Sequence, residues 1–255
     1  MTPPFSVVDG VGQVVLTAIH GGHDLRPEVA SRMAVEDAVR LREEDPFTDR
    51  LAEVTVPRVV VHRSRFEVDL NRPRDEAVYL SPEQAWGLTV WKRPPGEGVL
   101  ARSLALYDQF YQAISHLLDE VAMRGAFVVL DIHSYNHRRG GKDQPPAPAI
   151  ENPDINLGTG SLQRARWAQL VDGLSADLAM RLPDTSVAEN VRFRGGHLSH
   201  WINRRYAGAG CALALEFKKT FMDEWTGLLD VNAFDGLREA LAGATSGLCR
   251  RLGLR

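Results

Sequence analysis

The chain has 255 residues, of which 44% are hydrophobic and 25% are charged, and its formal net charge at pH 7 is −3. This is the composition of a folded globular protein with enough apolar material for a large core, and it excludes a largely disordered chain. A slightly acidic chain has no overall attraction for nucleic acid or an anionic membrane, so a small-molecule partner is expected. With two cysteines, no signal-like start and no membrane-length apolar run, the sequence favours a cytoplasmic protein.

Short apolar runs alternate with longer amphipathic ones, which predicts an α/β fold in a single domain over residues 1–255, with a mixed, mostly parallel central sheet flanked by helices. The expected central strands are rich in Val, Ile and Leu and span residues 13–19, 58–62, 126–132 and 212–217. Amphipathic patterns predict helices over residues 27–44, 104–124, 162–181 and 231–251. Long loops are expected at residues 82–98 and 137–160, and the second is expected to border the site because it follows a polar cluster at a strand end.

The first of these strands ends in the sequence HGGHD, which contains His20 and His23. The two glycines between the histidines permit a tight turn, so both imidazoles can bind one cation. The alternative is that one histidine caps a turn and the other is exposed.

After the second strand comes SRFEVDLNRPRD, in which Arg65, Asn71 and Arg72 are donors suited to a carboxylate or a carbonyl group. Arginines in loops are often only solvated, so this segment indicates a binding role only in combination with the others.

The third strand delivers Asp131, His133 and Ser134 at its carboxyl end, where open α/β sheets place their ligands. Asp131 and His133 are two residues apart and point to one side of the sheet, so Asp131 can orient the imidazole of a metal-binding His133. The alternative is a hydrogen-bonded histidine of the core.

In the fourth strand, Glu216 interrupts the apolar sequence LALEFKK. A buried carboxylate is costly unless it is paired or functional. Glu216 is therefore expected to be a general base, or else the ion-pair partner of Lys218, Lys219 or an arginine.

In this order the segments resemble the N-formylglutamate amidohydrolase family, with its early His-Ser-Gly, Ser-Arg-x-x-x-Asp-x-Asn-Arg, Asp-x-His-Ser, Gly-Gly-x-x-[ST] and a late apolar strand carrying one Glu. Here they are HGG from residue 20, SRFEVDLNR at 64–72, DIHS at 131–134, GGHLS at 195–199 and LALEFKKTFMDE at 213–224. REEDPFTDRL at 42–51 resembles a further family segment, with acids at the places of Asp45 and Asp49. The family is similar to zinc carboxypeptidases and aspartoacylases, so the resemblance implies their fold and a Zn²⁺ cofactor.

The resemblance also implies roles for individual residues around the metal. His20 and His133 take the places of zinc ligands, and Glu216 takes that of the general base. His23 stands where the carboxypeptidase pattern has its first Glu, and it is the expected third ligand. Asp45 is the competing candidate.

Asn71 and Arg72 take the places of substrate-binding residues, and His200 or Arg204 is expected to supply a further donor. The implied reaction is hydrolysis of the amide bond of an N-acyl amino acid such as N-formylglutamate. The alternatives are a metallocarboxypeptidase acting on peptides or cell-wall fragments, and a non-catalytic binding protein of the same fold. The sequence leaves the oligomeric state open, with a homo-oligomer among the alternatives.

Overall fold

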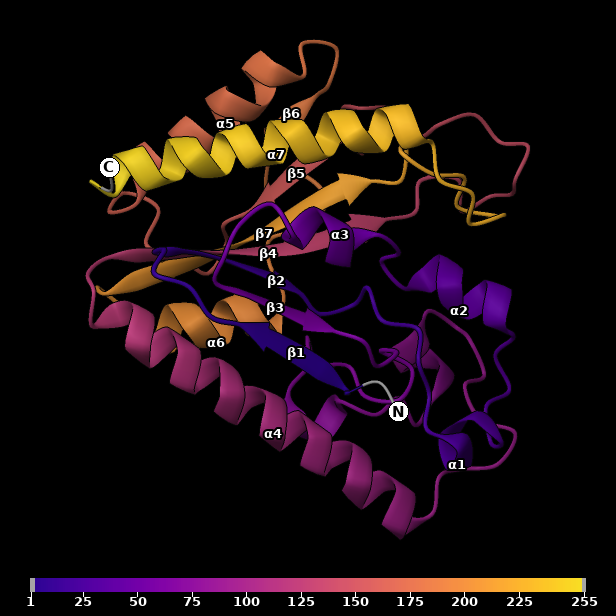
Figure 1. Cartoon of the computed structure of the whole chain (residues 1–255). Helices are drawn as coiled ribbons and strands as arrows, with labels where there is room; N and C mark the ends of the chain where they lie inside the picture. Colours follow the sequence, from indigo (N-terminus) through magenta and orange to yellow (C-terminus); the bar gives the residue numbers. More distant parts are fainter. Residues whose placement is uncertain (1–2, 254–255) are drawn as a thin grey trace.

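The computed structural model describes residues 3–253, which form one seven-stranded sheet in the order β1-β3-β2-β4-β7-β5-β6 (Figure 1). The central pairs β3–β2, β2–β4 and β4–β7 are parallel, whereas β1–β3 and β5–β7 are antiparallel. The expected mixed, mostly parallel α/β sheet is therefore confirmed. The strands are β1 Phe5–Val8, β2 Val14–Ala18, β3 Arg58–Val61, β4 Phe127–Tyr135, β5 Ile155–Gly158, β6 Val187–Glu189 and β7 Gly210–Lys218.

All four expected central strands are present, as β2, β3, β4 and β7. Every residue of β2, β4 and β7 is buried, which is why these strands are mostly apolar rather than alternating, with the polar residues of β4 and β7 toward their carboxyl ends. The strands β1, β5 and β6 were not expected. They have three or four residues each, and β5 lies inside residues 137–160, so that segment is not a loop throughout.

Helices cover both faces of the sheet. In Figure 1, α5 and α7 lie on one face, and α4 and α6 lie on the other. Successive residues of a strand point to opposite faces, so Leu16 packs in the core under α5 and α7, whereas Val15 packs in the core under α4 and α6. The helices are α1 Pro27–Ala30, α2 Asp37–Glu43, α3 Thr48–Ala52, α4 Glu97–Ala122, α5 Ala168–Arg181, α6 His197–Arg205 and α7 Val231–Arg251.

The helix expected over residues 27–44 is interrupted between α1 and α2. The backbone at residues 32–34 pairs with residues 90–92 instead, through the amide of Ala34 and the carbonyl of Arg32. This tertiary pairing outweighs the local helical pattern. In the described residues, no helix is both long and apolar enough to span a bilayer.

Candidate active site

Three buried side chains converge at the carboxyl end of the central strands: His20, which follows β2, Asp45, which follows α2, and His133 in β4. One ligand atom from each lies within 4.8 Å of the others. The carboxylate oxygen Oδ2 of Asp45 is 2.9 Å from Nδ1 of His133 and 3.5 Å from Nδ1 of His20. Segments distant in sequence therefore place two imidazoles and one carboxylate around one point.

The far side of the His20 ring is held by a buried carboxylate. Nε2 of His20 lies 2.7 Å from Oδ1 of Asp69, and the other oxygen of this carboxylate, Oδ2, accepts hydrogen bonds from the Arg65 guanidinium and the Tyr79 hydroxyl. Burial opposes ionisation of Asp69, but the charge of Arg65 and the contacts with His20 and Tyr79 outweigh it and hold the pKa of this carboxyl well below its usual range. An ionised Asp69 fixes the proton on Nε2 and leaves Nδ1 of His20 free to bind a cation.

A buried carboxylate also lies beside Nε2 of the second ring, although that contact does not have hydrogen-bond geometry. Nε2 of His133 is 3.0 Å from Oδ2 of Asp131, and the other oxygen of Asp131 accepts a hydrogen bond of 2.6 Å from the Thr17 hydroxyl. Asp131 is fully buried and two residues before His133 in β4, as the strand periodicity predicts. Both rings thus present Nδ1 to Asp45 and have a carboxylate behind Nε2.

This donor set is of a kind that can hold a metal ion. Two imidazole nitrogens and one carboxylate oxygen are a common protein ligand set for zinc, and they leave a fourth position open. Ligand atoms arranged tetrahedrally around zinc are about 3.3 Å apart. The separations of 2.9 and 3.5 Å from the Asp45 oxygen to the two rings bracket that value.

His23, the expected third ligand, lies outside this cluster, whereas Asp45, the competing candidate, lies within it. Nδ1 of His23 is 2.5 Å from the Glu44 carboxylate, Nε2 is 3.1 Å from the Arg40 guanidinium, and the side chain is 41% exposed. The backbone explains the difference: a Cβ on Gly22 would lie 2.2 Å from the carbonyl carbon of His62. The chain passes so close to the end of β3 that it carries His23 toward α2.

Glu216 lies beside His133, because the two residues are paired in the parallel register of β4 and β7. Its side chain lines the same cavity of about 220 Å³ as the His20–Asp45–His133 cluster. Burial raises the pKa of the Glu216 carboxyl to about 7. The proposed ion-pair partners bind elsewhere: Lys218 donates to the Ala147 carbonyl, and Lys219 to the Arg42 and Glu44 carbonyls.

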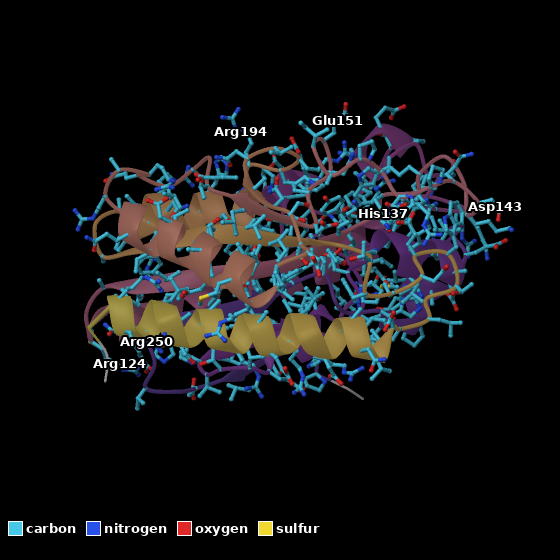
Figure 2. The ribbon with its side chains drawn as sticks, turned by 90° about the horizontal axis from the view of Figure 1, so that it is seen from above. Arg124, His137, Asp143, Glu151, Arg194 and Arg250 are labelled. Atoms are coloured by element: carbon cyan, nitrogen blue, oxygen red, sulfur yellow. The ribbon has the colours of Figure 1, made fainter. Side chains whose placement is uncertain are left out.

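Cations and aromatic side chains complete the wall of this cavity. Arg139 belongs to residues 137–160, so this segment borders the cavity as expected, and Trp86 comes from residues 82–98. Arg65 lies with its guanidinium carbon 4.8 Å from the Trp86 ring centre. Figure 2 shows Arg194, another lining residue, at the periphery of the molecule. The lining of the cavity therefore combines carboxylates with cations.

The predicted substrate-binding residues lie mostly in an adjoining groove. Asn71 lines both spaces, and its side-chain oxygen accepts a hydrogen bond of 3.0 Å from the amide of Leu198 at the start of α6. Arg72, His200 and Arg204 line only the groove, whose volume is about 620 Å³. The structure thus brings the predicted donors together next to the His20–Asp45–His133 cluster rather than over it.

Comparison with known proteins places this arrangement in a family. A sequence profile of N-formylglutamate amidohydrolases matches residues 12–222, which include all the residues of the cluster and Glu216. The chain belongs to the N-formylglutamate amidohydrolase family. None of the curated proteins searched matches it.

Two of the solved structures that it resembles have the same fold over nearly the whole of both chains. The N-formylglutamate amidohydrolase of Ralstonia eutropha JMP134 is 20% identical, with a TM-score of 0.80 and coverage of 98% of each chain. A gene product of Agrobacterium tumefaciens is also 20% identical, with a TM-score of 0.66 and coverage of 96% of each chain. The succinylglutamate desuccinylase of Chromobacterium violaceum is 14% identical, with a TM-score of 0.41, and the match covers 92% of this chain and 60% of that one.

Within this member of the N-formylglutamate amidohydrolase family, sequence reasoning overlooked two buried residues of the site. Asp69, which supports His20, is the Asp of the segment SRFEVDLNR, so the motif itself contained the signal. Lys219 lines the cavity and is 1% exposed, and the sequence indicated it only as one candidate ion-pair partner of Glu216.

Proposed function

We propose that the protein is a zinc-dependent amidohydrolase that cleaves the amide bond of an N-acyl amino acid such as N-formylglutamate. The observation that carries this proposal is the convergence of His20, Asp45 and His133 in a cavity that also contains Glu216. Membership in a family of amidohydrolases supports the same reaction class. A non-catalytic binding protein would have no need of Glu216, a buried carboxyl group that forms no ion pair with the described residues and lies beside three side chains of the kinds that bind metals.

In this proposal His20, Asp45 and His133 hold the ion, and Glu216 moves the proton. A zinc ion in such a site supplies a Lewis acid that polarises the scissile carbonyl and makes water a stronger nucleophile at neutral pH. Glu216 accepts a proton from the attacking water and donates it to the leaving amine. A carboxyl group whose pKa is about 7 exists in both forms at neutral pH, which suits this exchange.

Arg65 is the proposed stabiliser of negative charge that develops on the carbonyl oxygen. Its guanidinium lines the cavity and is held in place by Asp69 at 2.7 Å and by the Tyr79 hydroxyl at 3.2 Å. A charge fixed in advance, in a site largely shielded from water, requires little reorganisation during the reaction.

The groove next to the cavity is the proposed binding site for the carboxylates of the substrate. Arg72, His200 and Arg204 line it, and Asn71 connects it to the cavity. A guanidinium matches a carboxylate through two parallel hydrogen bonds, so an acidic amino acid is a suitable leaving group.

We expect Arg72→Ala to raise KM for an N-acylglutamate much more than for the analogue whose α-carboxylate is an amide. The reason is that only the carboxylate uses the guanidinium as a charged, two-point partner. Steady-state kinetics on the two substrates measures this difference. Arg74→Ala is the matched control, because Arg74 binds Asp108 through two hydrogen bonds and lies outside both spaces. Equal effects of Arg72→Ala on both substrates would refute carboxylate binding by this residue.

A metallocarboxypeptidase activity is the second candidate, and the groove favours it, because about 620 Å³ of open space leaves room for a peptide. Assays of amine release from N-formylglutamate, other N-acyl amino acids and short peptides with a C-terminal glutamate distinguish the two. If the proposed function is correct, we expect the protein to hydrolyse the N-acyl amino acids, to lose this activity with a chelator and to recover it when zinc is added. Turnover of the peptides alone would establish the second candidate, and turnover of neither would contradict both.

A further inference from the structure

Lys219 is a buried lysine in the wall of the active-site cavity. It follows β7 directly, three positions after Glu216, and only 1% of its surface is exposed. Burying an ammonium group is costly unless each of its hydrogens has an acceptor. The position of this side chain therefore depends on the groups that its ammonium contacts.

The ammonium group has three acceptors. Nζ of Lys219 donates to the carbonyl of Arg42 at 2.6 Å, to the carbonyl of Glu44 at 2.7 Å and to Oδ1 of Asn136 at 3.0 Å. An ammonium group has three hydrogens, so these contacts use all of them and leave none for a substrate. Burial lowers the pKa of Lys219 to about 8, so the side chain remains mainly charged at neutral pH.

Two of these acceptors, the carbonyls of Arg42 and Glu44, lie just before Asp45, the acidic member of the His20–Asp45–His133 cluster. The helix α2 ends at Glu43, and Glu44 leaves it in an extended conformation that leads to Asp45. On the other side, the amide of Asp45 donates to the His20 carbonyl at 2.9 Å, and its carbonyl accepts the Thr48 hydroxyl at 2.6 Å. Without Lys219 the peptide between Glu44 and Asp45 would lose its support on the side of β7.

We infer that Lys219 is a positioning residue of the metal centre: by holding the carbonyls of Arg42 and Glu44 against the ends of β4 and β7, it fixes the Asp45 carboxylate opposite the two imidazoles. This inference rests on the proposed function. Lys219 acts in this way through the backbone that precedes Asp45, and not by contact with the substrate.

The test compares Lys219→Met with Lys218→Met. Lys218 is the neighbouring buried lysine, but its Nζ donates to the Ala147 carbonyl at 2.9 Å and lies 3.5 Å from Asp154, away from the Asp45 segment. Both variants replace a buried lysine by an uncharged side chain of similar length. Both are therefore expected to lower the melting temperature of the metal-free protein. Only Lys219→Met is expected to weaken zinc binding, by about 10- to 100-fold, as removal of groups behind metal ligands does.

Competition with a chromogenic zinc chelator measures the affinity of the wild type and both variants. Equal zinc affinity of Lys219→Met and Lys218→Met would overturn the inference and leave Lys219 as a purely structural residue. A wild type that binds no zinc would instead overturn the proposed function, and the inference with it.

If Lys219→Met does not fold, Asn136→Ala decides the question. Asn136 accepts from Lys219 and donates to the Arg42 carbonyl at 2.8 Å, so the substitution loosens the same segment but keeps the ammonium group. A severalfold loss of zinc affinity supports the inference, and an unchanged affinity overturns it.

Discussion

Replacement of Glu216 by glutamine is expected to lower kcat by about 10²-fold or more, in line with the contribution of a general base, and to leave the fold intact. The amide has the shape of the carboxyl group but cannot accept the proton from water. Because Glu216 is buried and its pKa is raised to about 7, folding already disfavours its charged form. A neutral glutamine is therefore expected to preserve the melting temperature or to raise it. Kinetics and thermal melts on one preparation measure both quantities.

Glu224→Gln is the matched control for this substitution. Glu224 is also buried, but its carboxylate accepts the backbone amides of His137 and Arg138, at 2.8 and 3.0 Å, and lies 3.6 Å from Arg42. Its replacement is expected to reduce stability rather than kcat. A Glu216→Gln protein that turns over at the wild-type rate would leave the proposed reaction without a base. A large loss of stability with an unchanged kcat would restore the ion-pair interpretation.

Asp45→Ala is expected to abolish zinc binding and activity, whereas His23→Ala is expected to retain about one zinc per chain. Asp45 lies between the Nδ1 atoms of His20 and His133, and a site with two remaining ligands holds zinc weakly. The two ring nitrogens of His23 instead contact the side chains of Glu44 and Arg40. Elemental analysis of protein purified without a chelator gives the metal content, and the rate after addition of zinc shows whether activity returns.

The same measurements on His20→Ala and His133→Ala complete this experiment, and both are expected to behave like Asp45→Ala. Retention of zinc by Asp45→Ala together with its loss from His23→Ala would reinstate the pair of histidines in HGGHD as the site. Full metal content in all four variants would place the zinc elsewhere in the protein.

The centre of the fold was predictable because its strands are buried on both faces. The strand β4, for example, begins with the apolar run FVVL, which is rich in β-branched residues and too short for a typical helix, and this favours a buried strand. The edge strands β1 and β6 have four and three residues, and runs this short do not show a recognisable hydrophobic periodicity. The break after α1 was not predictable, because it depends on backbone pairing with residues 90–92.

The site was predictable where the motif and the strand coincide. The sequence pattern predicts the strands that carry Asp131, His133 and Glu216, and the parallel register of β4 and β7, seen only in the structure, sets Glu216 beside His133. The third ligand depends on the path of the chain after His20, which the close passage of Gly22 against β3 determines. No local pattern contains that information, and so Asp45 entered only through the family resemblance.

The carboxylates behind the two imidazoles also affect the balance of charge inside the protein. Asp45, Asp69, Asp131 and Glu216 are all buried around His20 and His133, and the cavity lining also contains the cations Arg65 and Lys219. When all four acids are ionised, they exceed these two bases by two charges. Burial opposes protonation of His133, but the charges of Asp131 and Glu216 outweigh it and raise the pKa of its imidazole well above the usual value, so an imidazolium offsets part of this excess when no cation is bound. A divalent cation held by His20, Asp45 and His133 would take over that role, and its removal is expected to cost folding free energy.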